Sequence, residues 1–169
     1  MIELANRMRD DAIKDVVKSD KLICYEAGMR MMGLGQAADQ KQDDIYRVSQ
    51  VARYFGRIVS LARQTLPNVS LDDLIKPCHF DLSVEIGKRM STGKEAPALN
   101  VGRTVGNLLR KACNSKYCTA LRTDDLDKQH DATNVKKLID SEWNNCVNRP
   151  AVRQIKPAKA GESANHSID

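Results

Sequence analysis

The sequence predicts an all-α protein with one compact domain of about six helices. Apolar residues recur every three or four positions along most of the chain, which places them on one side of a helix. Residues that cap helix ends, such as Ser, Asp and Gly, stand between these stretches. A length of 169 residues fits one domain, and with 4% aromatic residues its core must be mainly aliphatic. We expect a helical domain over residues 1–156 and a disordered tail over 157–169.

The chain before residue 41 predicts two helices and a loop. Apolar residues spaced four apart predict a first helix over Ile2–Lys18, with charged residues on its other sides. Ser19 or Asp20 would cap a second helix, which Gly33 would end. The polar residues 33–40 predict a flexible loop.

The most regular apolar stripe lies in the middle of the chain. Seven apolar residues between Ile45 and Leu66 recur by three and four positions, which predicts a long amphipathic helix. Pro67 would end this helix, because the residue before a proline avoids the helical region. Ser70 would then precede a short helical turn over Leu71–Ile75.

Two further helices are expected between residues 80 and 122. The segment Phe80–Ile86 predicts a helix, with a strand as the alternative. A charged loop over Ser91–Pro97 leads to a helix from Val101 to about Arg122. Gly102 and Gly106 each weaken a helix by about 1 kcal/mol relative to alanine. We therefore expect them to let a neighbouring helix approach closely.

The C-terminal part predicts one more long helix. Asp124–Gln129 is an acidic, polar connection, and apolar residues follow at helical spacing over 135–147. The single tryptophan, Trp143, is expected to anchor this helix to the core. Pro150 suits the first turn of a short terminal helix. The residues from Pro157 onward are too polar to be buried.

Basic charge is concentrated in the middle of the chain. The net charge is +5, whereas residues 41–122 contain 14 Lys and Arg against 7 Asp and Glu. Arginine forks bind phosphate without reading base sequence, so we predict contacts with double-stranded DNA. A solvated helix face is the alternative. No aromatic residues interleave the basic ones, which disfavours single-stranded nucleic acid. The candidate contacts on the two long helices are Arg47, Arg53, Arg57, Arg103, Arg110 and Lys111. The arginines are expected on the side opposite the apolar stripe, where they face solvent or a partner.

The chemistry-bearing residues predict no enzyme activity, cofactor or metal. His79, His130 and His166 have little around them to support acid–base or nucleophilic catalysis. Cys78 beside His79 suggests half of a metal site, but no other ligand has a plausible spacing. The five cysteines are an odd number without a C-x-x-C motif, which predicts reduced and mostly buried thiols.

Two other features have a structural and a functional interpretation. Gly33-Leu34-Gly35 lacks the third glycine and the lysine of a phosphate loop, so we interpret it as a helix stop. Met29, Met31 and Met32 predict core filling rather than an adaptable binding surface. The alternative function is a protein-interaction module, in which the methionine-rich helix or the last helix binds a partner helix or a second copy.

The apolar patterning predicts a soluble, intracellular protein without a membrane partner. No apolar run approaches the roughly 20 residues that span a bilayer. The first nine residues contain Glu3, Arg7 and Arg9 instead of the apolar core of a signal peptide.

Five segments in a fixed order resemble a large family of uncharacterised animal proteins that are derived from mobile elements. The segments, which cover about residues 8–156, are MRDDAIKDVVKSDKLICYEAGMRM, DDIYRVSQVARYFGRIVSLAR, SLDDLIKPCHFD, PALNVGRTVGNLLRKAC and LIDSEWNNCVNRPAVRQIK.

This resemblance implies a nuclear protein whose helical region is similar to the N-terminal core-binding part of tyrosine recombinases. Those enzymes need an H-x-x-R pair, and no histidine here is followed by arginine three residues later. The catalytic region is therefore absent, and no catalytic residue is carried over. Because relatives continue beyond this region, we expect a truncated copy, a fragment or a short variant.

Overall fold

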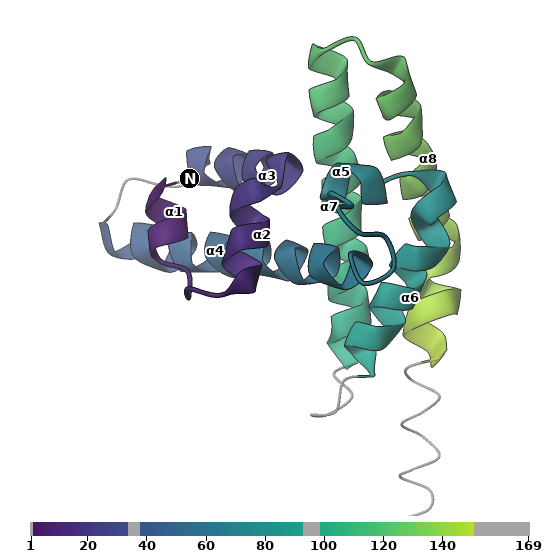
Figure 1. Cartoon of the computed structure of the whole chain (residues 1–169), viewed down its shortest axis with the longest axis horizontal. Helices are drawn as coiled ribbons and strands as arrows, with labels where there is room; N and C mark the ends of the chain where they lie inside the picture. Colours follow the sequence, from purple (N-terminus) through teal and green to yellow (C-terminus); the bar gives the residue numbers. More distant parts are fainter. Residues whose placement is uncertain (1, 34–37, 93–98, 151–169) are drawn as a thin grey trace, which may run out of the picture.

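The computed structural model describes residues 2–33, 38–92 and 99–150 and confirms the all-α fold (Figure 1). These residues contain eight α-helices and no strand. A 3-10 segment, η1, precedes α6, and a π-helical segment, η2, continues α8. The bounds are α1 Ile2–Asn6, α2 Ala12–Ser19, α3 Lys21–Met32, α4 Ala38–Ala62, α5 Leu71–Leu74, η1 Pro77–His79, α6 Phe80–Ser91, α7 Leu99–Arg122, α8 Leu126–Trp143 and η2 Asn144–Asn148.

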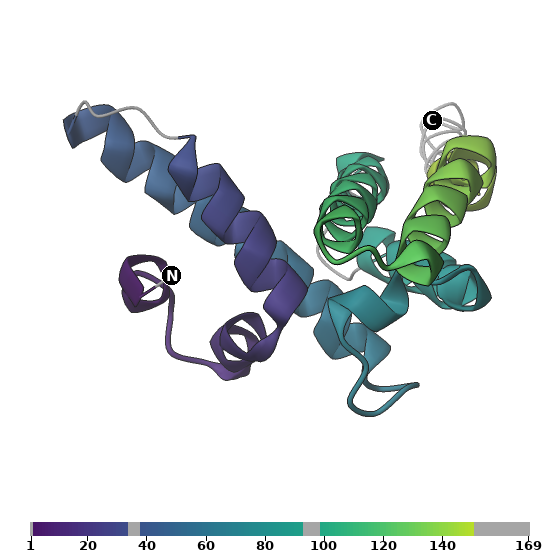
Figure 2. The ribbon, with the colours of Figure 1, turned by 90° about the horizontal axis from the view of Figure 1, so that it is seen from above.

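The helices form two groups that share one hydrophobic core. In the first group α1, α2 and α3 pack along α4, and in the second α6, α7 and α8 pack together (Figure 1). Figure 2 shows α3 beside α4 and α7 beside α8. Contacts of α3 with α7 and of α4 with α6 join the groups, and α5 lies between them against α3, α4 and α7. The buried apolar side chains accordingly form a single cluster from Leu4 to Val147.

The expected first helix is two helices, so the prediction of one helix over Ile2–Lys18 is wrong. α1 ends at Asn6, and α2 begins after Asp11, which has an extended backbone. The Asp11 carboxylate accepts the N–H of Lys14 at 3.1 Å and so caps α2. The four-residue spacing conceals this break because Met8 is buried although it lies in the turn between the helices.

The long helix α4 differs from the prediction at both ends. It begins at Ala38, inside the loop expected over 33–40. It ends at Ala62, one turn before the expected end at Leu66, and the chain then turns through Asn68 with a φ of 66°. Asparagine tolerates this left-handed conformation better than most residues.

The last long helix also begins earlier than predicted. α8 starts at Leu126, inside the polar connection expected over 124–129. The Asp125 carboxylate accepts the N–H of Lys128 at 3.1 Å, so an acidic residue that suggested a loop is the helix cap. The π-helical segment η2 then continues the chain through Val147, where the apolar stripe ends as expected.

Asp20 confirms the predicted start of α3 and also holds α5. Its Oδ1 accepts the N–H groups of Leu22 and Ile23, both at 3.0 Å. Its Oδ2 accepts the N–H of Leu71 at 2.7 Å, at the start of α5. Ser70 caps α5 as predicted, in a capping box with Asp73. One buried carboxylate therefore fixes two helices to each other.

Trp143 anchors α8 to the core, as the sequence predicts. Its ring lies against Gly106 of α7 and Gly87 of α6, and its indole N–H donates to the carbonyl oxygen of Gly102. A Cβ atom on Gly106 would lie 2.6 Å from the indole nitrogen. The glycines of α7 thus have the expected role of admitting a neighbouring helix.

Several predictions fall on residues outside the described ranges. These are the short terminal helix after Pro150, the tail over 157–169, the residues Leu34 and Gly35, and most of the loop over Ser91–Pro97. Within the described part of the chain, no helix is long and apolar enough to cross a membrane.

Candidate functional site

The exposed side of α7 contains three of the six predicted DNA contacts. At about 100° per residue, Arg103, Arg110 and Lys111 lie within an arc of about 100° around the helix. Arg103 and Lys111 are exposed, and Arg110 is partly exposed. The same side continues through Asn114 to Tyr117, which are also exposed. The prediction that these basic residues point away from the core is therefore confirmed for α7.

Arg110 is held toward α8 by an ion pair near the surface. Its Nε donates to Asp140 Oδ1 at 2.7 Å, and its Nη1 donates to Asn107 Oδ1 at 2.9 Å. The side chains of Arg110 and Asp140 remain 37% and 52% exposed. An ion pair with this exposure contributes at most about 1 kcal/mol, so Arg110 can turn to another anion at little cost.

Three adjacent surface hollows connect α7 with α3, α4 and α8. The largest, of about 490 Å³, lies between α3, α7 and α8. A second, of about 240 Å³, shares Asn114 and Lys136 with it. A third, of about 270 Å³, shares Met29 and Arg30 with the first and reaches Arg47 of α4. We call the basic residues along these hollows and the α7 stripe the α7 surface: Arg30, Arg47, Arg103, Arg110, Lys111 and Lys136.

Acidic residues offset only part of the charge on the α7 surface. Glu26 and Asp44 line the hollows, and Asp140 pairs with Arg110. Glu26 accepts Arg30 Nε at 2.8 Å. Lys111 and Lys136 form no ion pair with any side chain that the structure describes.

The structure corrects the expected placement of Arg53. Its side chain is only 12% exposed and turns toward the α1–α2 connection instead of solvent. Nη1 and Nη2 donate to the two carboxylate oxygens of Asp11 at 3.1 and 2.6 Å, and Nη1 also reaches the carbonyl oxygen of Arg9 at 3.4 Å. The hydrogen bond from Arg53, followed by that from the Lys14 N–H, lowers the pKa of Asp11 to about 2. Arg53 therefore has a structural partner within the chain.

Arg57 is exposed, as predicted, but it lies on another side of α4. At about 100° per residue it is about 80° from Arg47 around the helix. Arg47 lines the hollow between α3 and α4, whereas Arg57 lines none of the hollows of the α7 surface. Of the six predicted contacts, the α7 surface therefore contains four, and it lacks Arg53 and Arg57.

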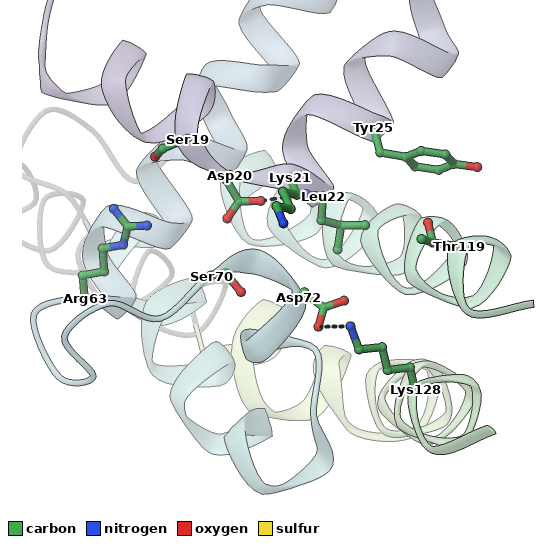
Figure 3. Close-up of a pocket in the computed structure, with 10 residues that line it drawn as sticks. All are labelled: Ser19, Asp20, Lys21, Leu22, Tyr25, Arg63, Ser70, Asp72, Thr119 and Lys128. Carbon is green, nitrogen blue, oxygen red and sulfur yellow. Dashed lines mark hydrogen bonds and ion pairs between the residues drawn. The ribbon is translucent and has the colours of Figure 1, made fainter. Parts of the chain in front are cut away.

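A separate pocket of about 430 Å³ lies where the two helix groups meet (Figure 3). It is bordered by the end of α2, the start of α3, the end of α4, the start of α5 and the facing ends of α7 and α8. The sequence singled out no function for it, because its walls come from six helical regions between residues 19 and 128. The lining residues are Ser19, Asp20, Lys21, Leu22, Tyr25, Arg63, Ser70, Asp72, Thr119 and Lys128.

A buried lysine behind this pocket holds the C-terminal end of α5. Lys116 is 1% exposed, and its Nζ donates to the carbonyl oxygens of Asp72 at 2.8 Å and Ile75 at 2.7 Å. The carboxylates of Asp72 and Asp131 lie 3.6 and 3.9 Å from the same nitrogen. Burial lowers the pKa of Lys116, and the two carboxylates oppose this shift. Sequence reasoning missed this residue because nothing in the helical pattern marks a lysine as buried.

The candidate metal pair at residues 78 and 79 forms no ligand cluster. His79 Nδ1 lies 2.7 Å from the carbonyl oxygen of Asp73, and Cys78 is exposed. Among the described residues, no group of three or more His, Cys, Asp and Glu side chains could hold a metal ion.

The predicted burial of sulfur-containing residues is only partly right. All five cysteines are free, but Cys113 alone is buried, and burial raises its thiol pKa to about 12. Met31 packs against the core, whereas Met29 and Met32 are 44% and 81% exposed. The expectation of core filling is therefore wrong for those two methionines.

Comparison with known proteins identified no relative of this chain. No protein-family model, curated protein or solved structure matches the chain. The resemblance to a mobile-element-derived family and to tyrosine recombinases therefore stays a prediction.

Proposed function

We propose that this protein is a non-catalytic helical module that binds double-stranded DNA weakly through the α7 surface. The observation that supports the proposal is the basic stripe of α7, with Arg103, Arg110 and Lys111 on one exposed side. Arg30 and Lys136 flank this stripe on the neighbouring helices. In this proposal the protein acts in the nucleus, as the family resemblance implies.

Binding would be directed at the phosphate backbone and not at the bases. Basic side chains that contact phosphates release condensed counterions, which makes affinity depend strongly on salt. The ion pairs of Arg30 with Glu26 and of Arg110 with Asp140 orient both guanidinium groups at the surface. The same acidic partners reduce the net positive charge, which accounts for the weak affinity that we propose.

The test is the affinity for a random-sequence DNA duplex, measured by fluorescence anisotropy at several salt concentrations. We expect the Arg103→Gln/Lys111→Gln double variant to lose about tenfold in affinity at low salt and to have a salt slope smaller by roughly two. The matched control, Lys18→Gln/Lys88→Gln, removes the same charge from exposed residues outside the α7 surface. Equal losses in both variants, or no binding by the wild type at about 50 mM salt, would overturn the proposal.

A protein-interaction module is the second candidate, and exposed apolar side chains favour it. Met29 and Met32 are exposed on α3, and Leu121 and Leu126 are 47% and 65% exposed at the turn between α7 and α8. Apolar side chains in such positions suit contact with a partner helix or a second copy. Light scattering would distinguish this function, because self-association gives a mass that increases with protein concentration. That result together with no DNA binding would favour the second candidate.

A further inference from the structure

We propose that the pocket in Figure 3 binds a small molecule with two or more anionic groups, such as a polyphosphate or a phosphate ester. This inference does not depend on DNA binding by the α7 surface. It rests on which polar groups of the pocket wall already have a partner and which remain available.

The available groups are cationic. Arg63 donates its Nε to the carbonyl oxygen of Val69 at 3.0 Å, and its two terminal nitrogens form no hydrogen bond with a described residue. Lys21 is exposed at the pocket wall and has no ion-pair partner among the described side chains. Lys128 shares Asp72 with Lys116, at 3.5 Å, and remains half exposed. Three cations from α8, α3 and the end of α4 therefore border one space.

The acidic groups of the pocket are already occupied. Both carboxylate oxygens of Asp20 accept backbone N–H groups, which hold this buried side chain in place. Asp72 lies between Lys116 and Lys128. The pocket wall therefore carries three cations, Lys21, Arg63 and Lys128, against the two carboxylates of Asp20 and Asp72. An anion is the complementary ligand for this excess of positive charge.

The hydroxyl groups lining the pocket also have partners within the chain. Ser70 is engaged with Asp73, and Tyr25 accepts a hydrogen bond from Arg122 at 2.6 Å. Ser19 and Thr119 donate to carbonyl oxygens of their own helices. Recognition would therefore come from charge-assisted bonds to the cations, with the O–H of Tyr25, which only accepts a bond from Arg122, as a further donor to an anion.

The arrangement of the cations indicates more than one anionic group in the ligand. In Figure 3, Arg63 and Lys128 lie at opposite sides of the pocket, with Lys21 between them. A volume of about 430 Å³ is within the range of small-molecule sites, and Leu22 and Tyr25 provide apolar contact area. A single small ion would not contact both sides at once. The shared chemistry is a chain of phosphates, supplied by a free phosphorylated molecule or by successive phosphates of a nucleic acid.

The test uses inorganic tripolyphosphate as the probe and isothermal titration calorimetry at low salt. We expect saturable binding to the wild type and a loss of about tenfold in affinity for Lys21→Gln/Lys128→Gln, because each cation contributes charge-assisted bonds. Lys88→Gln/Lys137→Gln is the matched control, with the same loss of charge from exposed lysines outside both the pocket and the α7 surface, and should bind within about twofold of wild type. No binding by the wild type, or an equal loss in both double variants, would overturn the inference.

Two further measurements test the contribution of Arg63 and identify the source of the phosphates. Arg63→Lys keeps the charge but removes the fork and its bond to Val69, so it should bind tripolyphosphate more weakly than wild type, and circular dichroism checks that the variant is folded. If the pocket variants also bind a DNA duplex more weakly, nucleic-acid phosphates occupy the pocket. If they lose only tripolyphosphate, the ligand is a free phosphorylated molecule. Either result supports a ligand with a chain of phosphates. If tripolyphosphate does not bind, this inference fails, and DNA binding by the α7 surface is decided by its own experiment.

Discussion

Trp143 of α8 donates its indole N–H to the carbonyl oxygen of Gly102 in α7, with a nitrogen–oxygen distance of 2.9 Å. The bond crosses the interface between two long helices at a point where the tryptophan is 2% exposed. Inside a helix a carbonyl oxygen normally accepts one backbone N–H, and its second lone pair is free for a side chain. The ring can approach α7 this closely because Gly106 has no side chain where the indole lies.

Substitution of Gly106 by alanine should destabilise the protein. A Cβ atom there would lie 2.6 Å from Trp143 Nε1, so the ring or the helix must shift. Overpacking of this kind costs about 1–3 kcal/mol, which exceeds the helix-propensity gain of about 1 kcal/mol. Urea unfolding gives the change in free energy.

Gly28→Ala is the control for that substitution, with the opposite sign. Gly28 also lies inside a helix, but nothing lies within 4 Å of its would-be Cβ atom. We expect this variant to be more stable than wild type by about 0.5–1 kcal/mol. Equal effects of the two alanines would contradict the close approach of Trp143 to α7.

Substitution of Lys116 by methionine should cost about 2–4 kcal/mol of folding stability. Methionine keeps the length and helix propensity of lysine but leaves the carbonyl oxygens of Asp72 and Ile75 without their donor. Lys111→Met changes the same residue type at an exposed position of α7 and should change stability by less than about 0.5 kcal/mol. Chemical denaturation of both variants tests this prediction, and similar small effects would argue against a structural role for Lys116.

The Arg53–Asp11 pair should stabilise the fold in a manner that depends on pH. The pKa of Asp11 in the folded protein, about 2, is below the ordinary value of 3.8. The unfolded chain therefore binds a proton first as the pH falls, so the stabilisation is complete above about pH 4 and disappears toward pH 2. The stability difference between wild type and Arg53→Gln, measured by thermal unfolding, should follow this window.

A carboxyl NMR titration gives the same pKa directly. In Arg53→Gln the pKa of Asp11 should rise toward 3.8 but stay below it, because the Lys14 N–H still donates to the carboxylate. Arg57→Gln, one helical turn further along α4, should leave the pKa of Asp11 unchanged. An identical shift in both variants would mean that the pKa reports general charge and not the bidentate contact.

The cysteines should differ in their rates of alkylation near neutral pH. Cys78 is exposed and should react first with iodoacetamide. Cys113 is buried and has a pKa of about 12, so its reactive thiolate is scarce until the protein unfolds. Peptide mass spectrometry after timed labelling measures both rates. Labelling of Cys113 as fast as Cys78 in the native protein would contradict its position in the core.

Local patterns determined much of the helical structure. The three-and-four spacing identifies the buried side of a helix wherever apolar residues alternate with polar ones, as in α4 and α7. Capping is similarly local, because Asp20 and Ser70 bond to N–H groups two or three residues ahead. The same spacing missed the break before Asp11, because a buried residue in a turn continues the apolar stripe without belonging to a helix.

The candidate sites depended on contacts between residues that are far apart in the chain. Arg53 and Arg57 look alike in the helical pattern. The guanidinium of Arg53 nevertheless binds Asp11, which lies 42 residues earlier in the chain, and is therefore less exposed to solvent. The pocket unites residues from Ser19 to Lys128, and no local pattern specifies that they meet.

What the sequence alone determined is therefore the fold class, the composition of the core and the side of α7 on which Arg103 and Arg110 lie. Helix periodicity depends on neighbours within one or two turns, which the chain order already specifies. The tertiary structure decided which charged side chains are fully engaged, such as Lys116 and Asp20. It also decided which ones keep donors without a described partner, such as Arg63. Charge pairing depends on distance in space, and only the packing of the two helix groups brings these side chains together.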